Sequence, residues 1–219
     1  MPPVRVLIGD DHRIVREGLK QVLAEADDLL VVAEATCGQE VLTQVDERQG
    51  PMGLDVVLLD IAMPGRDGLD LLQTLKRQHP ALPVLMLSTY PEKQYAVRCL
   101  RLGASGYLNK SADPDDMVAA VRKVAAGGRY VTPATAEALA ASVSGSRTPG
   151  GTESLSHREH QVFCCLAQGL SVSEIGAKLG IAANTVSTYR ARVLDKTGTR
   201  NDVELALLAE RLAQTSPQP

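Results

Sequence analysis

The sequence predicts two domains: an α/β domain built on a doubly wound, five-stranded parallel sheet, and an all-α domain that follows it. In the first part of the chain, short apolar runs alternate with helical patterns, whereas the last part has helical patterns alone. A stretch rich in Gly, Ser, Pro and Thr at 143–152 separates the two parts. We therefore expect an α/β domain at 1–128, a connecting helix and linker at 129–152, and a helical domain at 153–219.

The α/β domain is expected to contain five strands, each followed by a helix. The apolar runs that predict the strands lie at 4–8, 30–33, 55–60, 83–87 and 106–108. The helical patterns that follow them lie at 14–23, 38–48, 69–78, 92–102 and 113–126. Nearly continuous apolar strands joined through helices are typical of a parallel sheet that is covered on both faces.

The last part of the chain is expected to form four helices, at 156–168, 171–179, 183–196 and 202–213. Ser171 and Glu174 have the spacing of a capping box, in which each side chain bonds the backbone N–H of the other residue. A short turn at Gly180 joins that helix to the next, which makes the pair a helix-turn-helix candidate. An ordinary helical hairpin is the alternative at this point.

Composition excludes several classes of protein. Aromatic residues make up 3% of the chain, with no Trp, so a single-strand binder that stacks bases on aromatic side chains is disfavoured. No run reaches the roughly 18 apolar residues that cross a bilayer, so no membrane partner is expected. The four cysteines lack metal-binding spacing, and we expect a reduced, cytoplasmic protein. A net charge of −3 argues against a broadly basic nucleic-acid binder.

Four of the five predicted strands end in groups suited to phosphate chemistry. Asp10 and Asp11 come after the first strand, Asp60 ends the third, Ser88 follows the fourth and Lys110 follows the fifth. Ligands of doubly wound sheets bind beyond the carboxyl ends of the strands. Three clustered carboxylates would repel a phosphate, and a divalent cation such as Mg²⁺ removes that repulsion. Lys110 and Ser88 could then bind phosphoryl oxygens, and one carboxylate could act as a nucleophile that forms an acyl phosphate.

Each of these residues taken alone has a simpler explanation. An Asp pair after a strand usually caps a helix or lies in a solvated turn, and a single lysine usually lies at the surface. The combination at four strand ends is harder to explain in this way. A dinucleotide-binding oxidoreductase is disfavoured, because the first turn has two acids where such folds have the glycines of GxGxxG.

The helical domain has an uneven charge distribution. Residues 178–200 hold five basic side chains and one acidic one, whereas the rest of 153–219 holds two basic and six acidic. The basic stretch coincides with the second helix of the helix-turn-helix candidate, where small polar side chains share one face and arginines flank it. Small side chains near base edges and arginines on phosphates suit a helix that binds in a DNA groove. The residues expected to contact double-stranded DNA are Asn184, Thr185, Ser187, Thr188, Arg190, Ala191, Arg192 and Lys196.

The first part of the chain resembles the receiver domain of bacterial response regulators over about residues 4–127. The motifs that carry the resemblance are Asp10-Asp11, Asp60, Met63-Pro64-Gly65-Arg66-Asp67-Gly68, Ser88 and Gly103-Ala104-Ser105-Gly106-Tyr107-Leu108-Asn109-Lys110. The resemblance implies a flavodoxin-like (CheY-like) fold in which Asp60 is the phosphoacceptor. It also implies that Asp10, Asp11, Asp60 and the carbonyl of Ala62 hold Mg²⁺, and that Ser88, Tyr107 and Lys110 respond to the phosphoryl group. One departure is Ser111, which stands where many receivers have a cis proline, and it is expected to loosen that loop without changing the chemistry.

The second part resembles the LuxR-type DNA-binding domain. The motifs are Leu155-Ser156-His157-Arg158-Glu159, Ala167-Gln168-Gly169, Glu174-Ile175-Gly176-Ala177-Lys178-Leu179 and Asn184-Thr185-Val186. Together the two parts resemble the NarL/FixJ family, and most closely its UvrY/GacA branch. Four residues depart from the family pattern, namely Ser187, Tyr189, Thr197 and Asp202. The base preference therefore cannot be transferred from a relative, and phosphate contacts are expected to contribute less to DNA affinity than is usual in the family.

The resemblance implies a transcription factor that is switched by phosphorylation. Its expected partners are a sensor histidine kinase, double-stranded DNA and a second copy of the chain, which would pair through the helix at 204–212. An atypical regulator that works without phosphorylation is one alternative. An Mg²⁺-dependent phosphatase or phosphotransferase is another, but the residue two places after Asp60 is Ala62 and not the second acid that such enzymes use, so no enzymatic activity is expected.

Overall fold

The structure is a computed structural model that describes residues 2–48, 50, 53–63, 68–89, 92–144 and 155–214. The chain divides into two compact units, Met1–Gly145 and Ser146–Pro219, and each is described by itself. Of the predicted linker at 143–152, the description covers only residues 143 and 144, which end a helix.

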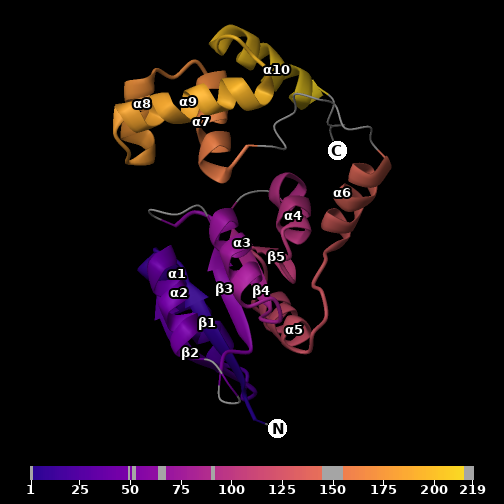
Figure 1. The fold of residues 1–219 in the computed structure, drawn as a ribbon. Coiled ribbons are helices and arrows are strands. Elements are labelled where there is room, and N and C mark those ends of the chain that lie inside the picture. The colour runs from indigo at the N-terminus through magenta and orange to yellow at the C-terminus, as the bar shows by residue number, and fades with distance from the viewer. Residues whose placement is uncertain are drawn as a thin grey trace. The chain divides into compact units, whose positions relative to one another are not determined.

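The first unit is built on a five-stranded parallel sheet (Figure 1). Its strands are β1 (Val4–Gly9), β2 (Leu29–Ala35), β3 (Val56–Asp60), β4 (Val84–Ser88) and β5 (Gly106–Asn109), in the order β2-β1-β3-β4-β5. Each predicted strand is present, with ends that differ by no more than two residues. The doubly wound parallel sheet predicted from the sequence is therefore confirmed, and its carboxyl edge carries the polar residues that follow the strands.

Helices cover both faces of the sheet, because successive side chains of a strand point to opposite faces. Val6 and Ile8 of β1 pack with α1 (Arg13–Ala24) and α5 (Pro114–Ala125). Leu7 packs on the other face with α2 (Gly38–Glu47), α3 (Gly68–Gln78) and α4 (Glu92–Arg101). All five residues of β3 and of β4 are buried, so the carboxyl edge of the sheet rests on two fully buried central strands.

A sixth helix, α6 (Pro133–Ser144), lies within the predicted connecting segment and packs against α4. The chain reaches it by running along the sheet edge, where Tyr130 forms a bridge with Gly106 and its N–H donates to the Ser105 carbonyl at 2.9 Å. A Cβ at Gly106 would lie 2.8 Å from the Tyr130 carbonyl oxygen, so only glycine fits there without a shift of the backbone. This segment protects the end of β5 from open-edge pairing.

The second unit has four helices, α7 (His157–Ala167), α8 (Val172–Leu179), α9 (Ala183–Thr197) and α10 (Asp202–Gln214), and no strand among its described residues. Its core includes Leu155, Phe163, Ile175, Val186 and Leu205. The capping box predicted at Ser171 and Glu174 is present at the start of α8, and a second one starts α7. None of the helices in the described residues of the chain is long and apolar enough to cross a bilayer.

Candidate functional site

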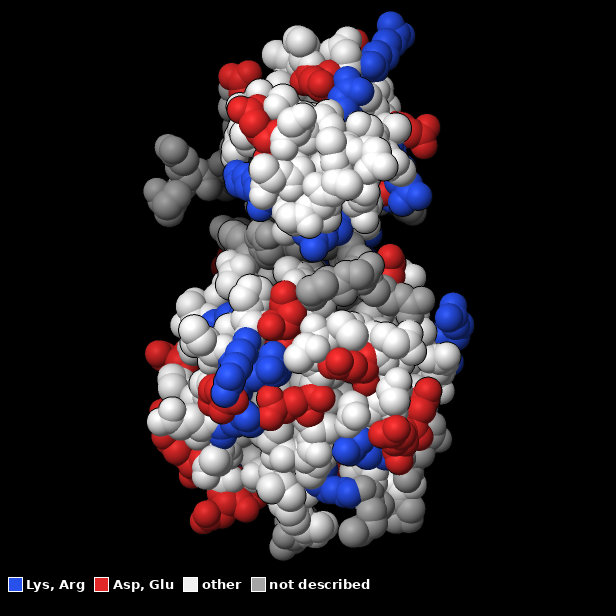
Figure 2. Space-filling model, turned by 90° about the vertical axis from the view of Figure 1, so that its left-hand side faces the viewer, with Lys and Arg blue, Asp and Glu red and all other residues white. Residues whose placement is uncertain are grey.

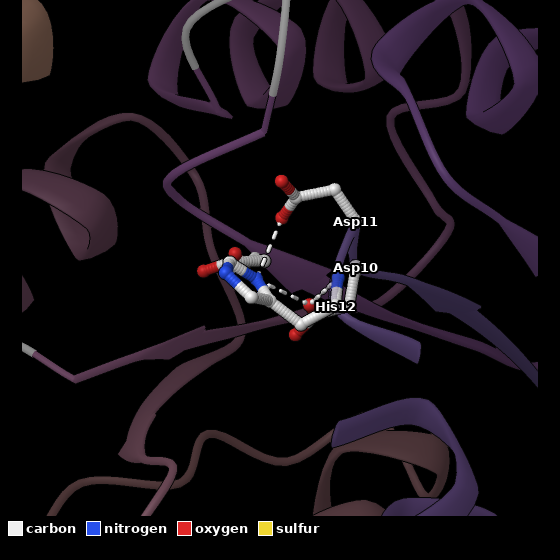
Figure 3. Close-up of side chains that lie close together, drawn as sticks. Asp10, Asp11 and His12 are labelled. Atoms are coloured by element: carbon white, nitrogen blue, oxygen red, sulfur yellow. Dashed lines mark hydrogen bonds and ion pairs between the residues drawn. The ribbon is translucent and has the colours of Figure 1, made fainter. Parts of the chain in front are cut away.

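Three carboxylates meet at the carboxyl edge of the sheet, as the strand ends predicted. Asp60 ends β3, and Asp10 and Asp11 follow the neighbouring β1. Asp10 and Asp60 are buried, at 0% and 2% exposed, whereas Asp11 is half-buried. One oxygen from each carboxylate and one nitrogen of His12 all lie within 4.8 Å of one another. Figure 3 shows the side chains of Asp10, Asp11 and His12 gathered beyond the end of β1.

Lys110 neutralises part of this charge. Its Nζ lies 2.6 Å from Oδ2 of Asp10 and 2.9 Å from Oδ2 of Asp60, and its backbone N–H donates to the Ser88 carbonyl at 2.8 Å. Burial raises the pKa of Asp60 above its ordinary value, although Lys110 opposes this. Burial alone would lower the pKa of Lys110, but the two carboxylates outweigh it and raise that pKa. Lys110 therefore stays protonated and can serve as a fixed positive charge.

His12 is a member of this cluster that sequence reasoning missed. Its Nδ1 lies 2.8 Å from Oδ1 of Asp11, and its backbone N–H donates to Oδ1 of Asp10 at 2.8 Å. Figure 3 draws the contact with Asp11 as a dashed line. The signal was present, because an imidazole directly after two acids is a possible partner for either. The side chain is 64% exposed, so it lies at the mouth of the cluster.

The donor set fits a hard divalent cation. Oδ2 of Asp10, Oδ1 of Asp11 and Oδ2 of Asp60 are buried oxygens that accept no hydrogen bond of good geometry, although Lys110 or His12 lies within ion-pair distance of each. Buried carboxylate oxygens need a proton donor or a cation to offset the loss of hydration. Carboxylates together with waters are the usual ligands of Mg²⁺.

The other receiver residues predicted from the sequence lie close to Asp60 in the sheet. The Ala62 N–H donates to the Asp60 carboxylate, which orients that loop at the site. Ser88 ends β4, the strand beside β3, and is 1% exposed. Tyr107 in β5 is also 1% exposed and packs in the apolar core beneath α4. Of the predicted motif that runs from Met63 to Gly68, residues 64–67 lie outside the described residues.

The loop after β5 is closed by side-chain hydrogen bonds. Asn109 accepts two of them at its Oδ1, from the backbone N–H of Ser111 at 2.9 Å and from its hydroxyl at 2.7 Å. No cis peptide bond is present among the described residues. Ser111 thus supplies contacts that a proline could not make, since proline has neither an N–H nor a hydroxyl.

In the second unit, α9 presents most of the predicted DNA-contacting side chains to solvent. Seven of the eight are exposed, namely Asn184, Thr185, Ser187, Thr188, Ala191, Arg192 and Lys196, while Arg190 is half-buried. Asn184, Thr185 and Thr188 line an open hollow together with Tyr189. Small polar side chains around a shallow hollow leave room for the edges of bases.

Two of the predicted DNA contacts are held by acids within the unit. Arg190 donates from Nε to both carboxylate oxygens of Asp202, at 2.8 and 3.1 Å. Lys196 donates to Glu159 at 2.6 Å. On the face of this unit that Figure 2 draws, basic and acidic groups are scattered around an uncharged centre, without a broad basic patch. The sequence did not reveal these two pairs, because their members are 12 and 37 residues apart.

Two family models match the chain. The response regulator receiver domain matches residues 6–122, and the luxR family of bacterial regulatory proteins matches residues 153–209. These ranges coincide with the sheet unit and the helical unit, so the sequence similarity and the geometry identify the same two parts.

Similar proteins match over nearly their full length. The response regulator GacA of Pseudomonas aeruginosa is 39% identical over 95% of this chain and 96% of its own. The transcriptional regulatory protein UhpA of Salmonella typhimurium is 41% identical over 93% of this chain and 96% of its own. A solved structure of two RcsB dimers bound to two parallel DNAs has a TM-score of 0.57 and 25% identity, over 95% of this chain and 98% of that one.

Proposed function

Because the chain belongs to the NarL/FixJ family of two-component response regulators, with a receiver domain and a LuxR-type DNA-binding domain, we propose that phosphorylation of Asp60 controls its binding to DNA. The observation that carries this proposal is the burial of Asp60 beside Asp10 and Lys110 at the carboxyl edge of the sheet. A carboxylate in this position is shielded from bulk solvent and is already paired with the Lys110 ammonium.

We propose that Asp10, Asp11, Asp60 and the Ala62 carbonyl hold Mg²⁺. When bound, Mg²⁺ would offset the charge of the carboxylates and of the incoming phosphoryl oxygens. Asp60 would attack the phosphorus of a phosphohistidine on a sensor histidine kinase. The P–N bond breaks as the P–O bond to Asp60 forms, and the released imidazole takes a proton. Lys110 would then pair with a phosphoryl oxygen.

Phosphorylation of Asp60 would be transmitted through conformational changes of side chains on the neighbouring strands β4 and β5. Ser88 in β4 can donate its hydroxyl to a phosphoryl oxygen, and Tyr107 in β5 is buried against the core below α4. We propose that phosphorylation favours a state in which Ser88 turns to the phosphoryl group and Tyr107 adopts its inward rotamer, which in this structure is already buried. Such a change is a shift between two populated states of the receiver domain.

For the DNA-binding domain, we propose that α9 enters the major groove. Asn184, Thr185, Ser187, Thr188 and Ala191 would face base edges, while arginines at positions 190 and 192 would contact phosphates. Lys196 remains in the proposed set, but Glu159 competes with a phosphate for its ammonium. A homodimer would bring two copies of α9 to two half-sites, as the RcsB dimers on DNA suggest.

The proposed domain limits are 1–128 for the receiver, 129–152 for the connecting helix and linker, and 153–219 for the DNA-binding domain. We further propose that the protein works in the cytoplasm, where its kinase and its DNA would meet it. We assign it no enzymatic turnover of its own, since the relatives are regulators of transcription.

The test is phosphorylation by acetyl phosphate in the presence of Mg²⁺. The Asp60→Asn variant should lose the acid-labile label, while Asp70→Asn, which removes an exposed acid on α3, should label like the wild type. Phosphorylation should also strengthen DNA binding by the wild type and leave Asp60→Asn unchanged. Full labelling of Asp60→Asn would place the phosphoacceptor elsewhere, and equal DNA binding with and without label would favour a regulator that works without phosphorylation.

A further inference from the structure

Arg190 on α9 is tied to the start of α10. Its Nε lies 2.8 Å from Oδ1 and 3.1 Å from Oδ2 of Asp202, so one N–H is shared between both oxygens of the carboxylate. The side chains are 35% and 44% exposed. The pair therefore lies at the surface of the DNA-binding domain, on the helix that we place in the groove.

Asp202 is held in place by the beginning of its own helix. The Asn201 side chain accepts from the Glu204 N–H at 2.9 Å, and the Glu204 side chain accepts from the Arg200 N–H at 2.8 Å. These two bonds order the backbone on both sides of Asp202. Asp202 is also the first residue of α10, where the helix dipole favours a negative charge. The backbone that carries the Asp202 carboxylate is thus hydrogen-bonded on both sides.

The geometry of the pair leaves most of the guanidinium available. An arginine side chain carries five N–H donors in one plane, one on Nε and four on the two terminal nitrogens. Both hydrogen bonds to Asp202 use Nε. The edge formed by the terminal nitrogens is the edge that binds phosphate oxygens in a bidentate manner.

The hydrogen bonds to Asp202 change how much side-chain entropy Arg190 loses when it binds DNA. An unpaired arginine side chain on the protein surface loses its rotamer freedom when it binds DNA. A side chain that is already held through Nε has lost much of that freedom before binding. Arg192, which follows on the same helix, is exposed and offers a comparison within the same domain. The negative charge of Asp202 acts in the other direction, because it weakens the long-range attraction to DNA.

We propose that Asp202 is a positioning residue for DNA recognition, which orients Arg190 so that its terminal nitrogens meet the DNA backbone. The inference rests on the proposed function of α9 and adds to it a residue from α10. The gain in DNA affinity from orienting Arg190 is larger than the loss caused by repulsion between the Asp202 carboxylate and the DNA phosphates.

The test is a double-mutant cycle on the full chain, measured by fluorescence anisotropy with a labelled duplex selected from random DNA by the wild type. Arg190→Ala is combined with Asp202→Ala, with Asp202→Asn and with Asp195→Asn. Asp202→Asn removes the charge and keeps an oxygen acceptor for Nε. Asp195→Asn removes an exposed acid of α9 and serves as the charge control. Circular dichroism checks that each variant keeps its helices.

If Asp202 positions Arg190, Arg190→Ala should weaken binding about tenfold in the wild-type and Asp195→Asn backgrounds, but only about twofold once Asp202 is Ala. In the Asp202→Asn background, Arg190→Ala should still cause most of this loss of DNA affinity. The proposal is overturned if Arg190→Ala causes an equal or a larger loss of DNA affinity in the Asp202→Ala background. A larger loss would mean that Asp202 only screens the charge of Arg190. Absence of any DNA binding by the wild type would overturn the proposed function together with this inference.

Discussion

The Nζ atom of Lys196 lies 2.6 Å from Oε2 of Glu159, and this ion pair joins α9 to the first turn of α7. Glu159 is almost fully buried and also accepts the Ser156 N–H at 2.6 Å, as part of the capping box of α7. Burial alone would raise the pKa of Glu159, but Lys196 and Ser156 outweigh it and hold the pKa below its ordinary value of 4.5. One carboxylate therefore links the cap of α7 to α9, the helix that we propose contacts DNA.

We expect the pair to make the DNA-binding domain sensitive to acid. Because the pKa of Glu159 is lower in the folded state, its contribution to stability is complete above pH 4.5 and is lost as the pH falls through the folded value. Glu159→Gln should lower the free energy of unfolding by about 1–3 kcal/mol at neutral pH. The difference from the wild type should shrink below pH 4.5, as followed by calorimetry. Asp195→Asn is the control, and a difference that does not depend on pH would contradict the assignment.

Lys196 and Arg192 should differ in how they affect DNA binding. Arg192 is exposed, so Arg192→Ala should reduce the slope of log affinity against log salt by about one unit. Lys196→Met should reduce that slope by less than Arg192→Ala does and should also lower the stability of the domain, because Glu159 competes with a phosphate for the Lys196 ammonium. The slope is measured by titrating duplex DNA at several salt concentrations. Equal losses of slope in the two variants would mean that Lys196 leaves Glu159 to contact a phosphate.

Removal of Lys110 should make the receiver domain depend on a divalent cation. Its Nζ lies between Asp10 and Asp60, so Lys110→Met would leave two buried carboxylates without their compensating charge. We expect a loss of about 3 kcal/mol in the absence of Mg²⁺. Added Mg²⁺ should then raise the unfolding temperature of Lys110→Met more than that of the wild type. Lys123→Met, at an exposed position of α5, should respond like the wild type; an equal response of all three proteins would contradict the prediction.

Gly68 allows α3 to start directly against the strand that carries Asp60. A Cβ at this position would lie 2.6 Å from Cα of Ile61 and 2.7 Å from the carbonyl oxygen of Asp60, so Gly68→Ala must displace backbone beside the proposed phosphoacceptor. We expect a loss of about 1–3 kcal/mol and slower labelling by acetyl phosphate.

Gly18 provides the matched control for this substitution. It lies inside α1, and a Cβ added there would meet no atom within 4 Å, so the site has room for a methyl group. Gly18→Ala should therefore stabilise the domain by about 0.5–1 kcal/mol and leave labelling unchanged. Normal labelling and stability of Gly68→Ala would show that the backbone at Asp60 adapts to the added methyl group. Urea unfolding and the labelling assay measure both effects.

The receiver domain could be predicted from sequence almost completely, because each of its elements has a local signal. Apolar runs such as the one at 55–60 predict strands, and their alternation with helices predicts a parallel sheet with one carboxyl edge. Residues at the carboxyl ends of different strands, such as Asp10 and Asp60, are then brought together by topology alone. Their close approach follows from the fold class, without knowledge of side-chain packing.

By itself, the sequence determined the two-domain architecture, the acidic cluster beyond the strand ends and the exposed face of α9. Only the tertiary structure decided the partners of the charged side chains: His12 with Asp11, Lys196 with Glu159 and Arg190 with Asp202. The reason is physical. Periodicity and topology depend on many residues at once, whereas an ion pair between two helices depends on their crossing angle and on rotamers, which no local pattern encodes. The net charge of the α9 region could therefore be counted from the sequence, but not which of its cations are paired with acids.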